Sequence, residues 1–241
     1  MPDPDTVSEA SMRMVIPKFY CLYSGGKDST VAASVLAEVG MLAAVVTIRT
    51  GIAAPDWYPF IRKTCEAQGW PLEVYETPVS YDKLVQQYGF PGPGAHGMFM
   101  NYLKGRAIRV FKHAHPDACL ASGVRKDESA RRFRQTREWS IFEGVPVWAP
   151  IWDWTTEDTW RYFNAHGFQR SPAYAILCIS GDCLCGAFAS PGEREMIASA
   201  YPEVHARLQR LEVICGASWG GRAATSRAKR QTSIVCTDCA K

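Results

Sequence analysis

The feature that most constrains the fold is a glycine-rich hexapeptide, SGGKDS, at residues 24–29. The preceding residues 18–23 are apolar and aromatic, which is typical of a buried strand, and residues 30–39 carry valine and leucine at helical spacing. A strand, a tight loop and a helix therefore follow one another. At such a junction glycines let the backbone approach an anion, and the amides at the helix start point toward it. The sequence therefore predicts a loop that holds the phosphates of a nucleotide.

The side chains of this loop strengthen the prediction. Lys27 brings a positive charge, and two serines bring hydroxyl donors. Asp28 would repel a bare phosphate, so it predicts a Mg²⁺ ion that bridges its carboxylate and the phosphates. The alternative is an ordinary Gly-Gly turn with a capping serine or aspartate. The predicted nucleotide-binding residues of the loop are Ser24, Gly25, Gly26, Lys27, Asp28 and Ser29.

The segments after the first helix continue an alternation of strands and helices. Residues 42–48 and 72–77 are strand candidates, and a helix is predicted between them over 56–68. This order predicts an α/β fold with a doubly wound, five-stranded parallel sheet, whose ligands lie beyond the carboxyl ends of the strands. Thr50 and Gly51 fall at such an end. They are expected either to line the nucleotide pocket or to form a strand-ending turn.

A basic helix is predicted over residues 98–112, after a glycine- and proline-rich loop at 88–97. Lys104, Arg106 and Arg109 give this helix a basic face. Such a face is usually solvated surface, and the alternative is a wall of the substrate channel.

A second motif begins where a fourth predicted strand, residues 118–122, ends. It places Gly123 at the end of the strand, and Arg125, Ser129 and Arg132 follow it. Two guanidinium groups and a hydroxyl can then face the pocket of the first loop. A charged helix start explains the same residues as an alternative.

A third motif lies at residues 150–160. Thr155 is predicted to cap a helix, and Asp158 supplies the carboxylate of its first turn. Trp160 and Phe163 are the predicted buried contacts of this helix. The motif is structural rather than catalytic.

Together the three motifs resemble one known superfamily. The hexapeptide resembles the signature of the PP-loop ATP pyrophosphatases, and residues 123–132 resemble the G-[LV]-R-x-x-[EQ]-S-x-x-R pattern of the phosphoadenosine phosphosulfate (PAPS) reductase family within it. Residues 150–160 are similar to the strand-to-helix transition of that family, and the resemblance spans residues 17–190 in order. It implies a Rossmann-like fold of the HUP type that binds ATP, PAPS or adenylyl sulfate (APS).

Nine cysteines are present, and most of them lie in the last third of the chain. Two close pairs that are far apart in the sequence form a plausible four-thiolate site for zinc or an iron–sulfur cluster. Buried thiols without a metal are the alternative. The resemblance favours a 4Fe-4S cluster over zinc. The predicted ligands are Cys183, Cys185, Cys236 and Cys239, with Cys178 as a substitute.

The chain departs from the reductase pattern at the residue that performs the chemistry. Sulfonucleotide reductases carry a nucleophilic cysteine in a Glu-Cys-Gly-[IL]-His segment, whereas this sequence ends in CTDCAK, and no Cys-Cys pair precedes Gly123. We therefore expect an enzyme that binds ATP with Mg²⁺, adenylates an acceptor and transfers sulfur to it with the help of the cluster. The predicted catalytic residues are Lys27, Asp28, Arg125 and Arg132.

Two other functions remain open at this point. One is reduction of a sulfonucleotide with Cys236 or Cys239 as the nucleophile. The other is a metal-stapled module that binds nucleic acid and senses ATP without turnover.

Charge and composition bear on the partners. The net charge of +3 is small, but basic stretches at 125–137 and 213–237 predict a DNA or RNA acceptor, with a solvated basic tail as the alternative. A sulfur-donor protein is a further expected partner. No apolar run is long enough for a membrane span and the first residues do not resemble a secretory signal, which predicts a cytoplasmic protein. We expect a nucleotide-binding domain over 17–170 and a Cys-rich, basic helical region over 171–241.

Overall fold

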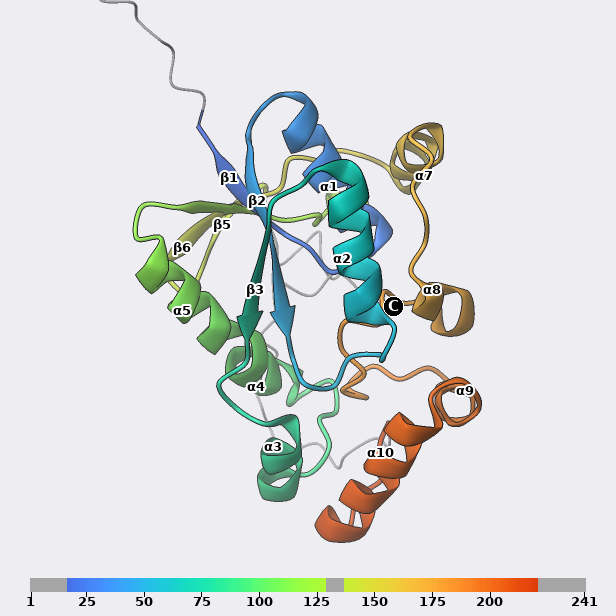
Figure 1. The fold of residues 1–241 in the computed structure, drawn as a ribbon. Helices are drawn as coiled ribbons and strands as arrows, with labels where there is room; N and C mark the ends of the chain where they lie inside the picture. Colours follow the sequence, from blue (N-terminus) through green and yellow to red (C-terminus); the bar gives the residue numbers. More distant parts are fainter. Residues whose placement is uncertain (1–16, 129–136, 221–241) are drawn as a thin grey trace, which may run out of the picture.

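The computed structural model describes residues 17–128 and 137–220 and is centred on one six-stranded sheet (Figure 1). Across the sheet the strands follow the order β3 (Leu72–Glu76), β2 (Leu42–Arg49), β1 (Phe19–Leu22), β4 (Cys119–Ala121), β6 (Val145–Trp148) and β5 (Trp139–Phe142). Neighbouring strands from β3 to β6 run parallel, and β5 runs antiparallel to β6. The predicted α/β fold with a parallel sheet is confirmed.

The sheet has one strand more than the predicted five, and that number is therefore wrong. The additional strand, β5, pairs with β6 as a hairpin. Glu143 and Gly144 connect the two strands with φ angles of +52° and +75°, and positive φ at both central residues matches the twist of paired strands. An Asn-Gly or Asp-Gly pair predicts such a turn from sequence, whereas Glu-Gly is a weak signal.

Helices connect the strands and continue beyond the sheet. They are α1 (Lys27–Glu38), α2 (Trp57–Gln68), α3 (Tyr81–Tyr88), α4 (His96–Met100), α5 (Arg106–Ala114), α7 (Thr156–Ala165), α8 (Pro172–Leu177), α9 (Glu193–Ala200) and α10 (Pro202–Cys215). The predicted cap of α7 is confirmed, because the Thr155 hydroxyl accepts from the Asp158 amide and the Asp158 carboxylate accepts from the Thr155 amide. None of the helices described for this chain is long and apolar enough to cross a membrane.

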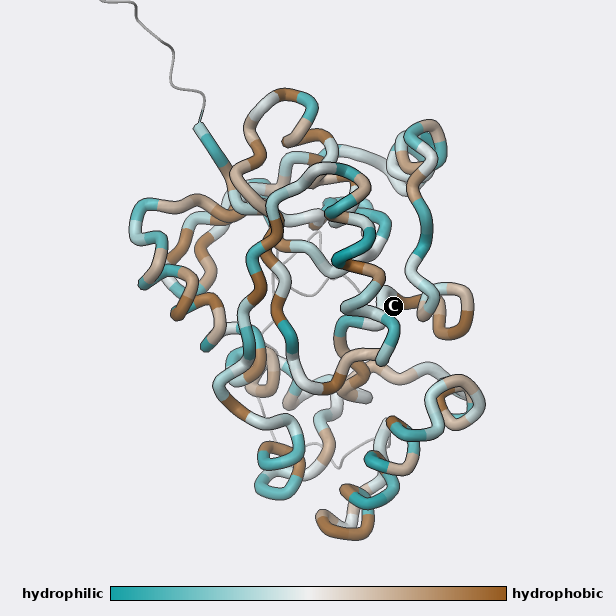
Figure 2. The backbone as a smooth tube through the Cα atoms, in the orientation of Figure 1, coloured by the Kyte–Doolittle hydropathy of each residue, from teal (hydrophilic) through white to brown (hydrophobic). Residues whose placement is uncertain are grey.

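Each face of the sheet has its own hydrophobic core. Cys21 and Val45 pack with residues of α1, α2 and α7, whereas their neighbours Leu22 and Val46 pack with residues of α5. Strand residues alternate between faces, so a strand covered on both sides is apolar throughout. Figure 2 shows hydrophobic residues along the central strands and an alternation of hydrophilic and hydrophobic residues along α10.

The region predicted as a single helix over 98–112 is divided into three parts. A π-helical turn over Asn101–Gly105 separates α4 from α5. Such turns change which side chains face inward and often occur at functional sites. Lys104, within this turn, is buried, whereas Arg109 on α5 is exposed. The expectation of a solvated basic face is therefore wrong for Lys104.

Residues after position 170 pack on the same core as the first half of the chain. Leu184, Ile197 and Trp219 belong to the cluster that contains Cys21 and α1. The helical character predicted for this region holds for α8, α9 and α10. The domain boundary at residue 170 stays a prediction.

Candidate nucleotide-binding site

The glycine-rich loop lies between the end of β1 and the start of α1, as predicted. Gly26 precedes the first helical residue in an extended conformation. Gly25 has a φ of +77°, and a Cβ atom there would lie 2.8 Å from the Cδ1 atom of Ile61 on α2. Glycine is thus favoured at position 25 both by its backbone angle and by the contact with α2.

Hydroxyl groups brace the loop from within. The Oγ atoms of Ser24 and Ser29 lie 3.1 Å apart, and the Gly26 amide donates to the Ser24 hydroxyl at 3.3 Å. The Ser29 hydroxyl donates to the Gly26 carbonyl at 2.9 Å. From α2, the indole of Trp57 donates to the Ser24 carbonyl at 2.7 Å. These bonds hold the loop in one conformation at the amino end of α1, where the helix dipole favours an anion.

Asp28 lies between two cations. Its Oδ1 atom is 2.5 Å from the ammonium of Lys27 and 2.9 Å from Nε of Arg125. The Arg125 side chain is only 3% exposed, and it also donates to the Trp154 carbonyl and the Thr156 hydroxyl, each at 3.3 Å. Because these two cations balance its charge, the Asp28 carboxylate can lie beside an anion site without a bound metal ion. A role of Asp28 in placing Mg²⁺ stays a prediction.

Gly123 brings the second motif against the first. A Cβ atom at this position would lie 2.5 Å from the carbonyl carbon of Asp28 and 2.6 Å from the backbone nitrogen of Ser29. The end of β4 therefore contacts the first turn of α1 backbone to backbone. Ser129 and Arg132, the other predicted members of this motif, lie outside the described residues.

A pocket opens at the carboxyl ends of β1, β2 and β4. Its lining residues are Leu22, Tyr23, Ser24, Ser29, Val46, Thr47, Ile48, Trp57, Lys104, Ser122, Gly123 and Asp182. The place agrees with the rule that ligands of open α/β sheets bind beyond the strand ends. Thr50 and Gly51 lie at the same edge: Thr50 is buried, and Gly51 lines a neighbouring pocket with Trp57.

Lys104 and Asp182 form a buried ion pair in the wall of this pocket. For Lys104 this position agrees with the alternative of a channel wall, whereas Asp182 was not predicted as a site residue. Their side chains are 4% and 6% exposed, and the ammonium lies 2.5 Å from Oδ2 of the carboxylate. The Ser180 hydroxyl donates to Oδ1 at 3.0 Å, and the Thr50 hydroxyl donates to the Asp182 carbonyl at 3.0 Å. The sequence places Lys104 only on the basic face of a predicted helix, and it contains no signal for Asp182.

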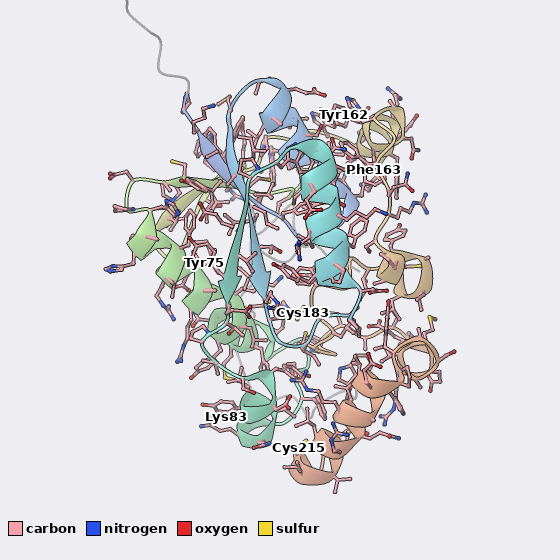
Figure 3. All side chains as sticks on the ribbon, in the orientation of Figure 1. Tyr75, Lys83, Tyr162, Phe163, Cys183 and Cys215 are labelled. Carbon is pink, nitrogen blue, oxygen red and sulfur yellow. The ribbon has the colours of Figure 1, made fainter. Side chains whose placement is uncertain are left out.

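The predicted metal ligands are partly brought together. Cys183 and Cys185 are hydrogen-bonded to each other, and this bond, together with burial, raises the pKa of the Cys183 thiol well above its ordinary value. Figure 3 shows Cys183 near the carboxyl ends of β2 and β3. Cys178 is exposed at the end of α8, and Cys236 and Cys239 lie outside the described residues. Among the residues that the structure describes, no three Cys, His, Asp or Glu side chains form a metal-binding group.

Comparisons with known proteins found similar sequences and a similar structure over most of the chain. The phosphoadenosine 5'-phosphosulfate reductases of Xanthomonas axonopodis pv. citri (strain 306) and Xanthomonas oryzae pv. oryzae (strain PXO99A) are each 26% identical over 176 residues, which cover 71% of this chain and 73% of those proteins. A crystal structure of PAPS reductase from Candida auris, a phosphate complex, is similar with a TM-score of 0.50 and 15% identity, over 68% of this chain and 79% of that chain.

The family profile for the phosphoadenosine phosphosulfate reductase domain matches residues 18–185. This range contains the glycine-rich loop, Arg125, Lys104 and the Cys183–Cys185 pair. The chain therefore belongs to the phosphoadenosine phosphosulfate reductase domain family.

Proposed function

We propose that this chain is an enzyme that binds an adenine sulfonucleotide and reduces its sulfate group to sulfite. One observation carries the proposal: the braced serine hydroxyls of the loop and the buried ammonium of Lys104 line a single pocket at the amino end of α1. Hydroxyl, amide and ammonium donors in this arrangement suit an oxyanion such as a phosphosulfate. The names of the relatives support a sulfonucleotide as its source.

In this proposal the loop binds the phosphosulfate through Ser24, Ser29 and the amides at the start of α1. Lys27 and Arg125 offset the charge that develops on the leaving phosphate as the sulfur–oxygen bond breaks. A thiolate, for which Cys236 or Cys239 is the predicted source, attacks the sulfur and displaces the nucleotide. A second thiol, from a dithiol protein, then attacks that cysteine, so that sulfite leaves and a disulfide forms.

A second candidate is ATP-dependent adenylation of an acceptor followed by sulfur transfer. It is favoured by the absence of a Glu-Cys-Gly-[IL]-His segment from the 241 residues. The same loop would then bind the β- and γ-phosphates with Mg²⁺, an acceptor oxygen would attack the α-phosphate, and sulfur would displace AMP. This candidate includes the predicted partners, which are DNA or RNA as the acceptor and a sulfur-donor protein. It also includes the predicted cytoplasmic location.

Two assays on the same preparation separate the candidates. We expect sulfite release from PAPS or APS in the presence of a thioredoxin-type dithiol, and an Arg125→Met variant should be slower by about a hundredfold, a typical cost of losing one charge-stabilising donor. Arg62→Met, on the exposed face of α2, is the control and should retain full activity. ATP–pyrophosphate exchange without sulfite release would contradict the proposed reduction and favour adenylation as the function. Nucleic-acid binding with neither activity would favour the non-catalytic module.

We further propose that Cys183 and Cys185 bind a 4Fe-4S cluster together with Cys236 and Cys239, and zinc is the alternative metal. The hydrogen-bonded pair fits half of such a donor set. When bound, such a cluster would supply one-electron redox chemistry.

Anaerobic purification followed by visible spectroscopy and iron, sulfide and zinc analysis tests this metal site. A broad absorption shoulder with stoichiometric iron and sulfide should be lost in Cys183→Ser and kept in Cys215→Ser, a thiol at the end of α10 outside the predicted set. Colourless protein with stoichiometric zinc would establish zinc instead. Protein that carries neither metal would contradict the proposal.

A further inference from the structure

Ser122 has a buried hydroxyl for which the described residues provide no hydrogen-bond partner. Its side chain follows β4 and lines the pocket, the residue is 2% exposed, and its Oγ atom contacts no donor or acceptor in the described part of the chain. Buried hydroxyls are nearly always hydrogen-bonded, and an unpaired one is destabilising. Among the described residues this hydroxyl is an exception, and its place in the wall of a pocket points to a partner supplied by a bound ligand.

The fold does not require this hydroxyl. The backbone amide of Ser122 donates to the Trp148 carbonyl at 2.8 Å, so the pairing of β4 with β6 is complete without the side chain. Other buried hydroxyls nearby are satisfied within the protein. Thr47, also in the pocket wall, donates to the Tyr23 carbonyl at 2.8 Å, and Ser180 donates to Asp182.

The position of Ser122 indicates the chemistry of the missing partner. Its neighbour Gly123 contacts the backbone of Asp28 and Ser29, so Ser122 stands beside the loop that starts α1. Ser24 and Ser29 of the loop and Lys104 line the same pocket. A set of hydroxyl and ammonium donors around one space fits a tetrahedral oxyanion.

We propose that the Ser122 hydroxyl donates a hydrogen bond to a phosphate or sulfate oxygen of the ligand bound in this pocket. The inference rests on the proposed function of the pocket as an oxyanion site and assigns it a further binding residue. Unlike the loop serines, whose hydroxyls bond to each other, Ser122 gains its partner when the ligand binds. Its hydroxyl therefore contributes to affinity and lowers the stability of the ligand-free protein.

This produces a pair of effects that a merely structural serine would not show. Ser122→Ala should leave the melting temperature of the ligand-free protein unchanged or raise it, because an unpaired buried polar group is removed. The same variant should bind ligand about tenfold more weakly, the loss of one hydrogen bond to a charged group. Ser34→Ala is the matched control. Its buried hydroxyl bonds to the Tyr162 hydroxyl at 2.9 Å outside the pocket, so this variant should melt lower and bind normally.

The measurement is thermal unfolding and calorimetric titration of the full chain with PAPS, ATP and inorganic phosphate, on wild type and both variants. The ligand whose affinity falls in Ser122→Ala identifies the source of the oxyanion. Ser122→Cys, which has nearly the same shape but a weak donor, should show the same loss of affinity. Equal affinity of wild type and Ser122→Ala would overturn the role of Ser122 while nucleotide binding stands. A wild-type chain that binds none of the three ligands would overturn the oxyanion site itself.

Discussion

Gly123→Ala is expected to abolish ligand binding and to lower the free energy of unfolding by about 1–3 kcal/mol, the usual cost of overpacking. The new Cβ atom would lie 2.5–2.6 Å from backbone atoms of Asp28 and Ser29. Backbone at the first turn of a helix cannot rotate away as a long side chain can. The start of α1 must therefore move, and with it the amides and hydroxyls that form the anion site.

Denaturant unfolding and calorimetric titration with the sulfonucleotide measure both effects. Gly94→Ala is the control, because a Cβ atom there meets nothing within 4 Å and its φ lies outside the left-handed region. It should bind normally and unfold as wild type does. A Gly123→Ala protein with wild-type affinity would show that contact between β4 and α1 does not position the site.

Lys104→Met is expected to destabilise the protein by about 3–5 kcal/mol, because one partner of a buried ion pair is removed and the Asp182 carboxylate is left buried without it. The loss should be smaller in the double variant Lys104→Met/Asp182→Asn, which removes both charges and keeps an acceptor for the Ser180 hydroxyl. Both variants should bind the oxyanion more weakly than wild type, since each lacks the ammonium in the pocket wall.

A double-mutant cycle from denaturant unfolding curves measures the coupling between Lys104 and Asp182. Arg62→Met provides the comparison, because the Arg62–Glu66 pair on α2 is exposed, at 60% and 68%, and should change stability by less than about 1 kcal/mol. Additive effects of the Lys104 and Asp182 substitutions would show that the pair contributes no coupling energy. Unchanged ligand affinity in Lys104→Met would show that Lys104 does not contribute to ligand binding.

Local sequence was sufficient for the loop, the parallel sheet and the cap of α7. Glycine at positions 25 and 26, an apolar strand before them and helical periodicity after them specify backbone angles and buried faces over a few residues. The predicted strands and α2 lie where these patterns place them, and Arg125 reaches the loop as its motif implied. The additional strand β5, antiparallel to β6, was not predicted, since a Glu-Gly turn has no strong sequence signal.

Tertiary structure alone decided how the pocket is completed. The π-helical turn directs Lys104 inward, and Asp182, 78 residues further along the chain, lies opposite it. In the described part of the chain no group pairs with the Ser122 hydroxyl, and no local sequence pattern around position 122 predicts this. Local patterns report backbone conformation and the side of an element that is buried, because these depend on near neighbours. The hydrogen bonds and ion pairs of a buried charge or hydroxyl depend instead on residues of distant segments. These residues come into contact only when the segments pack together.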